Sequence, residues 1–122
     1  MGLRVLIVDD ALFMRNMLKD IFLRAGHQVV GEAANGVEAV ECYRELHPDL
    51  VTMDIVMPLK SGIEALQEIT AGDPAACVIM CSALGQDALV VEAVQSGARD
   101  FIVKPFKEER VLDVVRRVAG QG

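Results

Sequence analysis

Short apolar runs alternate along the chain with longer stretches in which apolar residues recur at helical spacing. Within the short runs the apolar residues are continuous and do not alternate with polar ones, which is typical of strands buried on both faces of a parallel sheet. The pattern therefore predicts five strands, at residues 5–8, 29–34, 50–53, 77–81 and 101–103.

The stretches between these runs predict helices and carry their own boundary signals. Asn35 is a typical N-cap residue, and Ser61 with Glu64 has the spacing of a capping box. Gly97 is placed to end the fourth helix. The predicted helices cover residues 11–25, 36–46, 62–70, 86–96 and 107–119. Strands alternating with helices in this way favour a (βα)5 chain, that is, an α/β doubly wound parallel sheet.

Most of the predicted strands are followed directly by polar or charged residues. These are Asp9 and Asp10 after the first strand, Asp54 after the third, Ser82 after the fourth and Lys104 after the fifth. Each one alone has an ordinary interpretation as a turn residue, a helix cap or a solvated charge. Because the carboxyl ends of parallel strands share one edge of the sheet, where doubly wound folds bind ligands, we expect all five side chains to meet there.

The predicted cluster carries excess negative charge. Three aspartates and one lysine leave a formal charge of −2 at this edge. Mg²⁺ suits such a site because it binds carboxylate oxygens, water and phosphoryl oxygens, whereas zinc prefers Cys and His ligands, which these strand ends lack. A cation flanked by a lysine would also neutralise a dianionic phosphoryl group. We therefore predict that the adjacent carboxylates of Asp9 and Asp10 hold a metal ion.

Composition and charge exclude several classes of protein. A chain of 122 residues suits a single domain, and no apolar run approaches the roughly 20 residues that a membrane span needs. No secretion signal precedes the first strand, so we expect one cytoplasmic domain over residues 1–122. The net charge is −6, and the only dense basic pair is Arg116 with Arg117, which disfavours a nucleic-acid surface.

The cysteines and histidines lack the spacing of a disulfide or a metal site. Cys42, Cys77 and Cys81 contain no CxxC pair, and the last two would lie about 13 Å apart along one strand. We therefore expect free thiols, with Cys77 and Cys81 as small core residues. His27 and His47 fall in predicted loops and are expected to be solvated.

Sequence motifs occur in order along the whole chain: LIVDD at 6–10, TMDIVMP at 52–58, SG at 61–62, CSALG at 81–85 and DFIVKPF at 100–106. Together they resemble the receiver domain of two-component response regulators. The resemblance implies the flavodoxin-like fold with strand order 2-1-3-4-5, which this family is known to adopt. It also implies a single receiver domain over residues 1–122 with no effector domain, most similar to the single-domain regulators of chemotaxis.

The resemblance implies roles for the acidic residues. Asp54 would be the phosphoacceptor, attacking the phosphorus of a phosphohistidine on a sensor histidine kinase to form an aspartyl phosphate. Asp10 and Asp54 would bind Mg²⁺ directly. Val56 would add its backbone carbonyl to the metal ligands, and Asp9 would act largely through a bound water.

The resemblance also implies roles for residues of the last two strands. Lys104 would pair with the phosphoryl oxygens, and Ser82 would contact them once the phosphate is in place. Phe101 would be the aromatic switch that turns inward when Ser82 moves. The peptide bond from Lys104 to Pro105 is expected to be cis.

The function implied by the resemblance is a signalling switch in a two-component phosphorelay. The protein would catalyse its own phosphorylation and dephosphorylation and would not be an enzyme acting on a separate substrate. The expected partners are a CheA-like sensor histidine kinase, a flagellar motor switch protein or another output target, and an auxiliary phosphatase. We expect a monomer with no nucleic-acid or membrane partner.

Alternative functions remain open. The chain could be a single-domain phosphorelay intermediate that passes its phosphoryl group to another histidine protein. It could also be a small Mg²⁺-dependent phosphatase with Asp54 as nucleophile, although Val56 occupies the position at which such enzymes place a general acid. An FMN carrier is disfavoured because the chain has no Trp, a single Tyr and no phosphate-binding loop after the first strand.

Some residues near the predicted site differ from those that many relatives carry at the same positions. Val56 and Leu84, each two residues beyond a site residue, are apolar where many relatives carry groups that orient the hydrolytic water. Residues 59–61 read Leu-Lys-Ser where the family often has an acid or Asn before the glycine. We therefore do not expect the dephosphorylation rates or loop contacts of those relatives to apply here.

The predicted helix at residues 86–96 is more apolar than packing on one face of a sheet requires. Its apolar residues are Ala88, Leu89, Val90, Val91, Ala93 and Val94. They cover more than the stripe of roughly 100° that contacts a core. We therefore expect part of this helix to expose apolar surface to a partner.

Overall fold

The computed structural model describes residues 2–120 as a parallel sheet covered by helices on both faces. The strands are β1 (Arg4–Val8), β2 (Gln28–Ala33), β3 (Leu50–Asp54), β4 (Val78–Ser82) and β5 (Asp100–Val103). Their order is β2-β1-β3-β4-β5, and every neighbouring pair is parallel. The predicted α/β doubly wound, flavodoxin-like fold and its strand order are thus confirmed.

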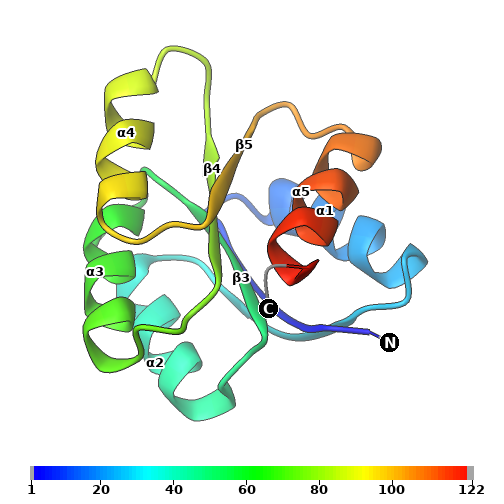
Figure 1. Cartoon of the computed structure of the whole chain (residues 1–122), viewed down its shortest axis with the longest axis horizontal. Coiled ribbons are helices and arrows are strands. Elements are labelled where there is room, and N and C mark those ends of the chain that lie inside the picture. The colour runs from blue at the N-terminus through cyan, green and yellow to red at the C-terminus, as the bar shows by residue number, and fades with distance from the viewer. Residues whose placement is uncertain (1, 121–122) are drawn as a thin grey trace.

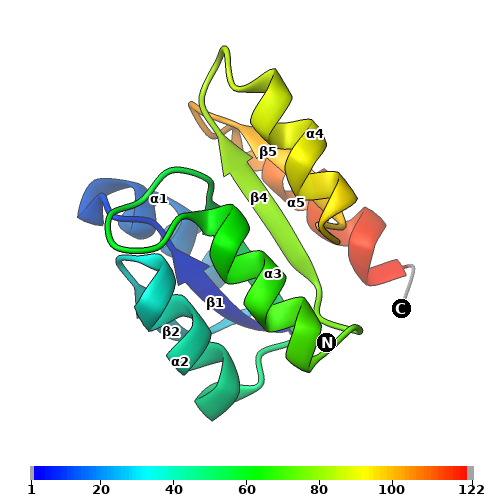
Figure 2. The same cartoon turned by 90° about the vertical axis from the view of Figure 1, so that its left-hand side faces the viewer.

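The helices form the two outer layers. They are α1 (Leu12–Arg24), α2 (Gly36–Leu46), α3 (Gly62–Gly72), α4 (Asp87–Gln95) and α5 (Glu108–Gly120). Helices α1 and α5 cover one face of the sheet, and α2, α3 and α4 cover the other (Figures 1 and 2). Every helix and strand boundary lies within two residues of its predicted position.

The central strands are buried on both faces, which explains why their sequences are continuously apolar. All residues of β3 and β4 are buried, and so are Val5 to Val8 of β1. Separate hydrophobic clusters lie on the two sides of the sheet, one under α2, α3 and α4 and the other under α1 and α5. This packing holds the strands rigidly and so fixes where their carboxyl ends lie.

The residues that predicted the helix boundaries cap or end those helices in the structure. The Asn35 side chain accepts a hydrogen bond from the Glu38 amide at 2.9 Å. Ser61 and Glu64 form both hydrogen bonds of the capping box, at 3.1 and 3.2 Å. Gly97, with φ of 111°, follows the end of α4 in a backbone conformation that favours glycine.

The cysteines are free, as predicted, and Cys81 is a fully buried core residue. Cys77 is half-buried and packs against the cluster under α1 and α5. His47 is exposed, as expected, but the prediction that His27 is solvated is wrong. His27 is half-buried because its Nδ1 accepts a hydrogen bond from the Leu3 amide at 3.0 Å and its ring packs edge-on against a core phenylalanine.

The described residues contain no helix with the length and apolar character needed to cross a bilayer. This finding agrees with the distribution of apolar residues in the sequence.

Gly62, the first residue of α3, lies directly against the end of β3. Its amide donates to the carbonyl oxygen of Ile55 at 2.8 Å. A Cβ atom at this position would lie 2.0 Å from the carbonyl oxygen of Asp54 and 2.9 Å from its carbonyl carbon. Only glycine therefore allows α3 to start this close to the strand end that carries Asp54.

We predict that Gly62→Ala destabilises the fold, because the new methyl group would overlap backbone atoms that cannot move aside. The expected loss is about 1–3 kcal/mol of unfolding free energy, measured by urea denaturation. Gly72→Ala, in the last turn of the same helix, is the matched control because nothing lies within 4 Å of its added Cβ. Equal stability of the two variants would show that the close contact at Gly62 is not limiting.

Candidate functional site

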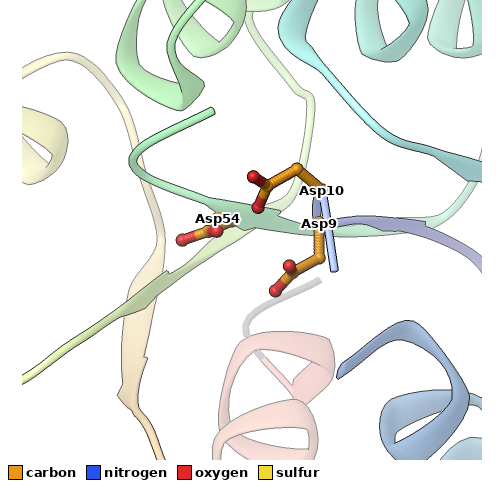
Figure 3. Close-up of side chains that lie close together, drawn as sticks. All are labelled: Asp9, Asp10 and Asp54. Atoms are coloured by element: carbon orange, nitrogen blue, oxygen red, sulfur yellow. The ribbon is translucent and has the colours of Figure 1, made fainter. Parts of the chain in front are cut away.

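The carboxyl ends of β1, β3, β4 and β5 bring the predicted site residues to one edge of the sheet. Asp9 and Asp10 follow β1, Asp54 ends β3, Ser82 ends β4 and Lys104 follows β5. One carboxylate oxygen from each aspartate lies within 4.8 Å of the others, as Figure 3 illustrates. The expected convergence is therefore present for the three aspartates and for Lys104, while Ser82 is placed at the same edge by its strand.

Asp9 is held firmly in the site. It is only 1% exposed, and its own amide donates to the carbonyl of Ala33 on β2 at 3.0 Å. Its Oδ1 accepts from the amide of Ala11 at 2.9 Å, and its Oδ2 accepts from the ammonium of Lys104 at 2.8 Å. Both carboxylate oxygens of Asp9 therefore already have a protein donor.

Lys104 bridges two of the carboxylates. Its Nζ lies 2.8 Å from Asp9 Oδ2 and 3.2 Å from Asp54 Oδ2. Burial opposes the charged form of this lysine, but the hydrogen bond to Asp9 and the charge of Asp54 outweigh that effect and raise its pKa. Lys104 therefore remains an ammonium group at neutral pH.

Asp54 is buried beside another carboxylate. Burial raises the pKa of its side chain, the charge of Asp9 raises it further, and Lys104 offsets only part of the effect. The ionised form of Asp54 is thus disfavoured when the site holds no further cation. A ligand that brought positive charge next to Asp54 would relieve this penalty.

Asp10 differs from the other two aspartates because it is exposed. Within residues 2–120 its carboxylate accepts no hydrogen bond and forms no ion pair. The cluster therefore offers a free carboxylate, a partly neutralised one on Asp54 and a net charge of −2 from three aspartates and one lysine. An oxygen-only donor set of this kind fits Mg²⁺ and gives zinc none of its preferred ligands.

An apolar rim, defined here as Val56, Leu59 and Leu84, lies on the loops that follow β3 and β4. All three side chains are exposed, with Leu84 at 82%. Leu59 adopts a positive φ of 67°, a conformation that costs a branched residue about 1–2 kcal/mol. None of these three side chains can donate or accept a hydrogen bond.

Ser82 and Phe101 lie on the last two strands and border a groove beside α4. Ser82 is buried, Phe101 is half-buried, and both line an apolar pocket of about 560 Å³. Val91 and Val94 of α4 line the same pocket and are 57% and 50% exposed, which confirms that this helix shows apolar surface. The peptide bond from Lys104 to Pro105, at the end of β5, is cis as expected.

Arg15 contacts the site, but nothing in the sequence predicted this contact. Its Nη1 donates to the carbonyl oxygen of Asp9 at 2.7 Å, and its Nε donates to Glu32 at 3.0 Å. In the sequence Arg15 is one polar residue on an amphipathic helix, and neither its spacing nor its neighbours separate it from a solvated surface arginine. Only the packing of α1 beside β2 reveals the contact.

Comparisons with known proteins agree with this geometry. Residues 5–116 match the model of the response regulator receiver domain. The chain is 60% identical over 119 residues to the chemotaxis protein CheY of Thermotoga maritima, covering 98% of this chain and 99% of that protein. It is 57% identical over 117 residues to CheY of Bacillus subtilis, covering 96% and 98% of the two chains.

A solved structure is similar in both fold and sequence. The CheY chain in a CheX-CheY-BeF₃-Mg²⁺ complex from Borrelia burgdorferi superimposes with a TM-score of 0.91 at 43% identity, covering 95% of this chain and 88% of that one. The matched family model spans most of the chain and includes every residue of the acidic cluster together with Lys104. The chain therefore belongs to the family of response regulator receiver domains.

Proposed function

We propose that this protein is a Mg²⁺-dependent switch of chemotaxis signalling that is phosphorylated on Asp54. The observation that carries the proposal is the acidic site itself. A buried carboxylate lies within 4.8 Å of two others and 3.2 Å from a lysine ammonium, in a chain 60% identical to a chemotaxis regulator. The proposal treats residues 1–122 as a single receiver domain acting as a monomer.

In the proposed reaction, a carboxylate oxygen of Asp54 attacks the phosphorus of a phosphohistidine on a sensor histidine kinase. The new O–P bond forms as the N–P bond breaks, and the electron pair of that bond returns to the imidazole, which takes up a proton. Lys104 faces the transferring group and stabilises its oxygens. Asp9, Asp10, Asp54 and the carbonyl of Val56 would hold Mg²⁺, which neutralises phosphoryl charge when bound.

Helix α4 and its groove are the proposed output surface. Ser82 lines the groove and follows Cys81, the residue that pairs with Asp54 across β3 and β4, so a phosphoryl group on Asp54 that attracted Ser82 would open space for Phe101 to turn inward. Such a movement needs only to shift the balance between two existing conformations. The flagellar motor switch protein is the proposed target.

The apolar rim affects how an aspartyl phosphate at this site would be hydrolysed. Because Val56 and Leu84 offer no side-chain donor or acceptor, neither can orient a water molecule for attack on an aspartyl phosphate. We propose that an auxiliary phosphatase supplies the polar group that this chain lacks. The relative from Borrelia burgdorferi is bound to CheX, which shows that a partner protein can bind a CheY chain of this fold.

Two other functions fit less well. A phosphorelay intermediate would use the same acidic site, and rapid transfer of the label to a second histidine protein would distinguish it. A phosphatase acting on separate substrates would need a general acid near Asp54, but the residue two positions on is the exposed, apolar Val56.

Phosphorylation provides the first test. Incubation with Mg²⁺ and acetyl phosphate should add one hydroxylamine-labile phosphoryl group, and Asp54→Asn should abolish it because the nucleophilic oxygen is lost. Intact-protein mass spectrometry measures both results. Asp20→Asn, at an exposed position of α1, should label like the wild type, and full labelling of Asp54→Asn elsewhere would contradict the assignment.

Metal dependence of stability provides a second test. Without metal at pH 7, Asp10→Asn should raise the free energy of unfolding by about 1 kcal/mol, since it removes one of three crowded charges in a solvated setting. The variant should also lose most of the stabilisation that millimolar Mg²⁺ gives the wild type by mass action. Thermal melts with and without MgCl₂ measure both effects, with Asp20→Asn as the charge control.

The gain from Asp10→Asn should depend on pH. Because the folded pKa of Asp54 lies above its unfolded value, ionising Asp54 costs stability, and that cost appears as pH rises through the raised pKa. The advantage of the variant should therefore be larger at neutral pH than in acid, and it should shrink as acid protonates Asp54. An advantage that stayed constant down to pH 3 would argue against repulsion within the cluster.

Target binding provides a further test. Beryllofluoride, as a phosphoryl mimic, should tighten binding to the motor switch protein of the same organism by about 5- to 150-fold. Phe101→Ala should reduce this ratio while leaving the labelling of Asp54 intact, because it removes the side chain that responds to Ser82. Phe13→Ala, which truncates an exposed phenylalanine on α1, is the matched control. Equal affinity of the two wild-type states would rule out a switch.

A further inference from the structure

Arg15 lies in the second turn of α1 and links the turn after β1, which carries Asp9 and Asp10, to the edge strand β2. Its side chain is only 16% exposed. Nη1 donates to the backbone carbonyl oxygen of Asp9 at 2.7 Å, and Nε donates to Glu32 Oε1 on β2 at 3.0 Å. Lys19 approaches the other oxygen of Glu32 at 3.5 Å, so this carboxylate is itself held from two sides.

The carbonyl that Arg15 holds belongs to the peptide unit joining Asp9 to Asp10. A peptide unit is planar and includes the Cα of Asp10, so fixing its oxygen restrains where that Cα lies. Asp9 is restrained independently through its amide and both carboxylate oxygens. The carboxylate of Asp10 accepts no hydrogen bond within residues 2–120, so it depends on the backbone for its position.

We propose that Arg15, braced by Glu32, is a positioning residue for the cation site. It would act through the Asp9–Asp10 peptide and hold the Asp10 carboxylate close to that of Asp54, as Figure 3 shows it. This inference rests on the proposed function in one respect, namely that the acidic cluster binds Mg²⁺.

The geometry calls for an arginine. A guanidinium group presents several donors in a rigid plane and can satisfy a carbonyl and a carboxylate at the same time. A lysine would bring the same charge, but its single ammonium on a flexible chain holds no fixed orientation between the two acceptors. Arg15→Lys therefore keeps the electrostatics and loses the geometry.

The sign of the effect separates positioning from simple electrostatics. A positive charge next to a cation site repels the cation, so removing the charge of Arg15 would by Coulomb's law tighten Mg²⁺ binding. Loss of positioning weakens Mg²⁺ binding, because the Asp10 carboxylate is no longer held where it can contact the metal. The two explanations therefore predict changes in opposite directions.

The test is calorimetric titration of the full chain with MgCl₂, well below the melting temperature. Arg15→Met should raise the dissociation constant about 10-fold, the lower end of the usual effect of residues that orient metal ligands. Arg15→Lys should weaken binding at least as much, because it loses the same geometry and keeps the charge that repels the cation. Arg24→Met removes an arginine of the same helix that is paired with Glu108, and it should leave the constant unchanged.

Urea denaturation in the absence of metal accompanies each titration. A merely structural role for Arg15 would lower stability without changing the dissociation constant of the folded protein, and that result would overturn the proposal. Unchanged or tighter binding by Arg15→Met would do the same. Should Arg15→Met fail to fold, the Arg15→Lys titration decides, and wild-type affinity in that variant would refute positioning. Failure of the wild type itself to bind Mg²⁺ would instead contradict the proposed function.

Discussion

Repulsion among three crowded carboxylates is the constraint on which the rest of this site depends. Asp9, Asp10 and Asp54 place one oxygen each within 4.8 Å, and Lys104 neutralises only part of their charge. Burial makes the penalty larger for Asp54, whose pKa is raised. The fold tolerates this arrangement because the strands that carry these residues are fixed by the apolar packing beneath them.

Around the cluster, the backbone supplies the rigidity that the side chains need. Gly62 lets α3 begin against the carbonyl of Asp54, where any side chain would collide with backbone atoms. Arg15 holds the carbonyl of Asp9 from the opposite layer. The end of β3 and the turn after β1 are therefore supported from different faces of the sheet, which suits the proposed cation site, where several oxygens would face one ion.

The same edge of the sheet joins the acidic site to the surface proposed for output. The amide of Lys104 donates to the carbonyl of Ser82 at 2.7 Å, so the ends of β4 and β5 are linked by the backbone next to the lysine that contacts two aspartates. Ser82 and Phe101 then line the apolar groove along α4. Lys104, which contacts Asp54, is thus bonded through its backbone to a residue of the groove that a partner could bind.

The sequence by itself determined the architecture and the membership of the cluster. Continuous apolar runs specified buried parallel strands, caps such as Asn35 and Ser61 specified where helices begin, and the order of strands and helices placed Asp9, Asp54 and Lys104 at one edge. These features are local or topological, so a pattern along the chain can carry them. The tertiary structure alone decided which carboxylates Lys104 contacts and that Asp10 is the exposed aspartate. It also decided that His27 is hydrogen-bonded and not solvated. The contact of Arg15 with the carbonyl of Asp9 likewise came only from the structure. Each of these depends on the distance and burial of groups from different elements, which the spacing of residues along the chain does not encode.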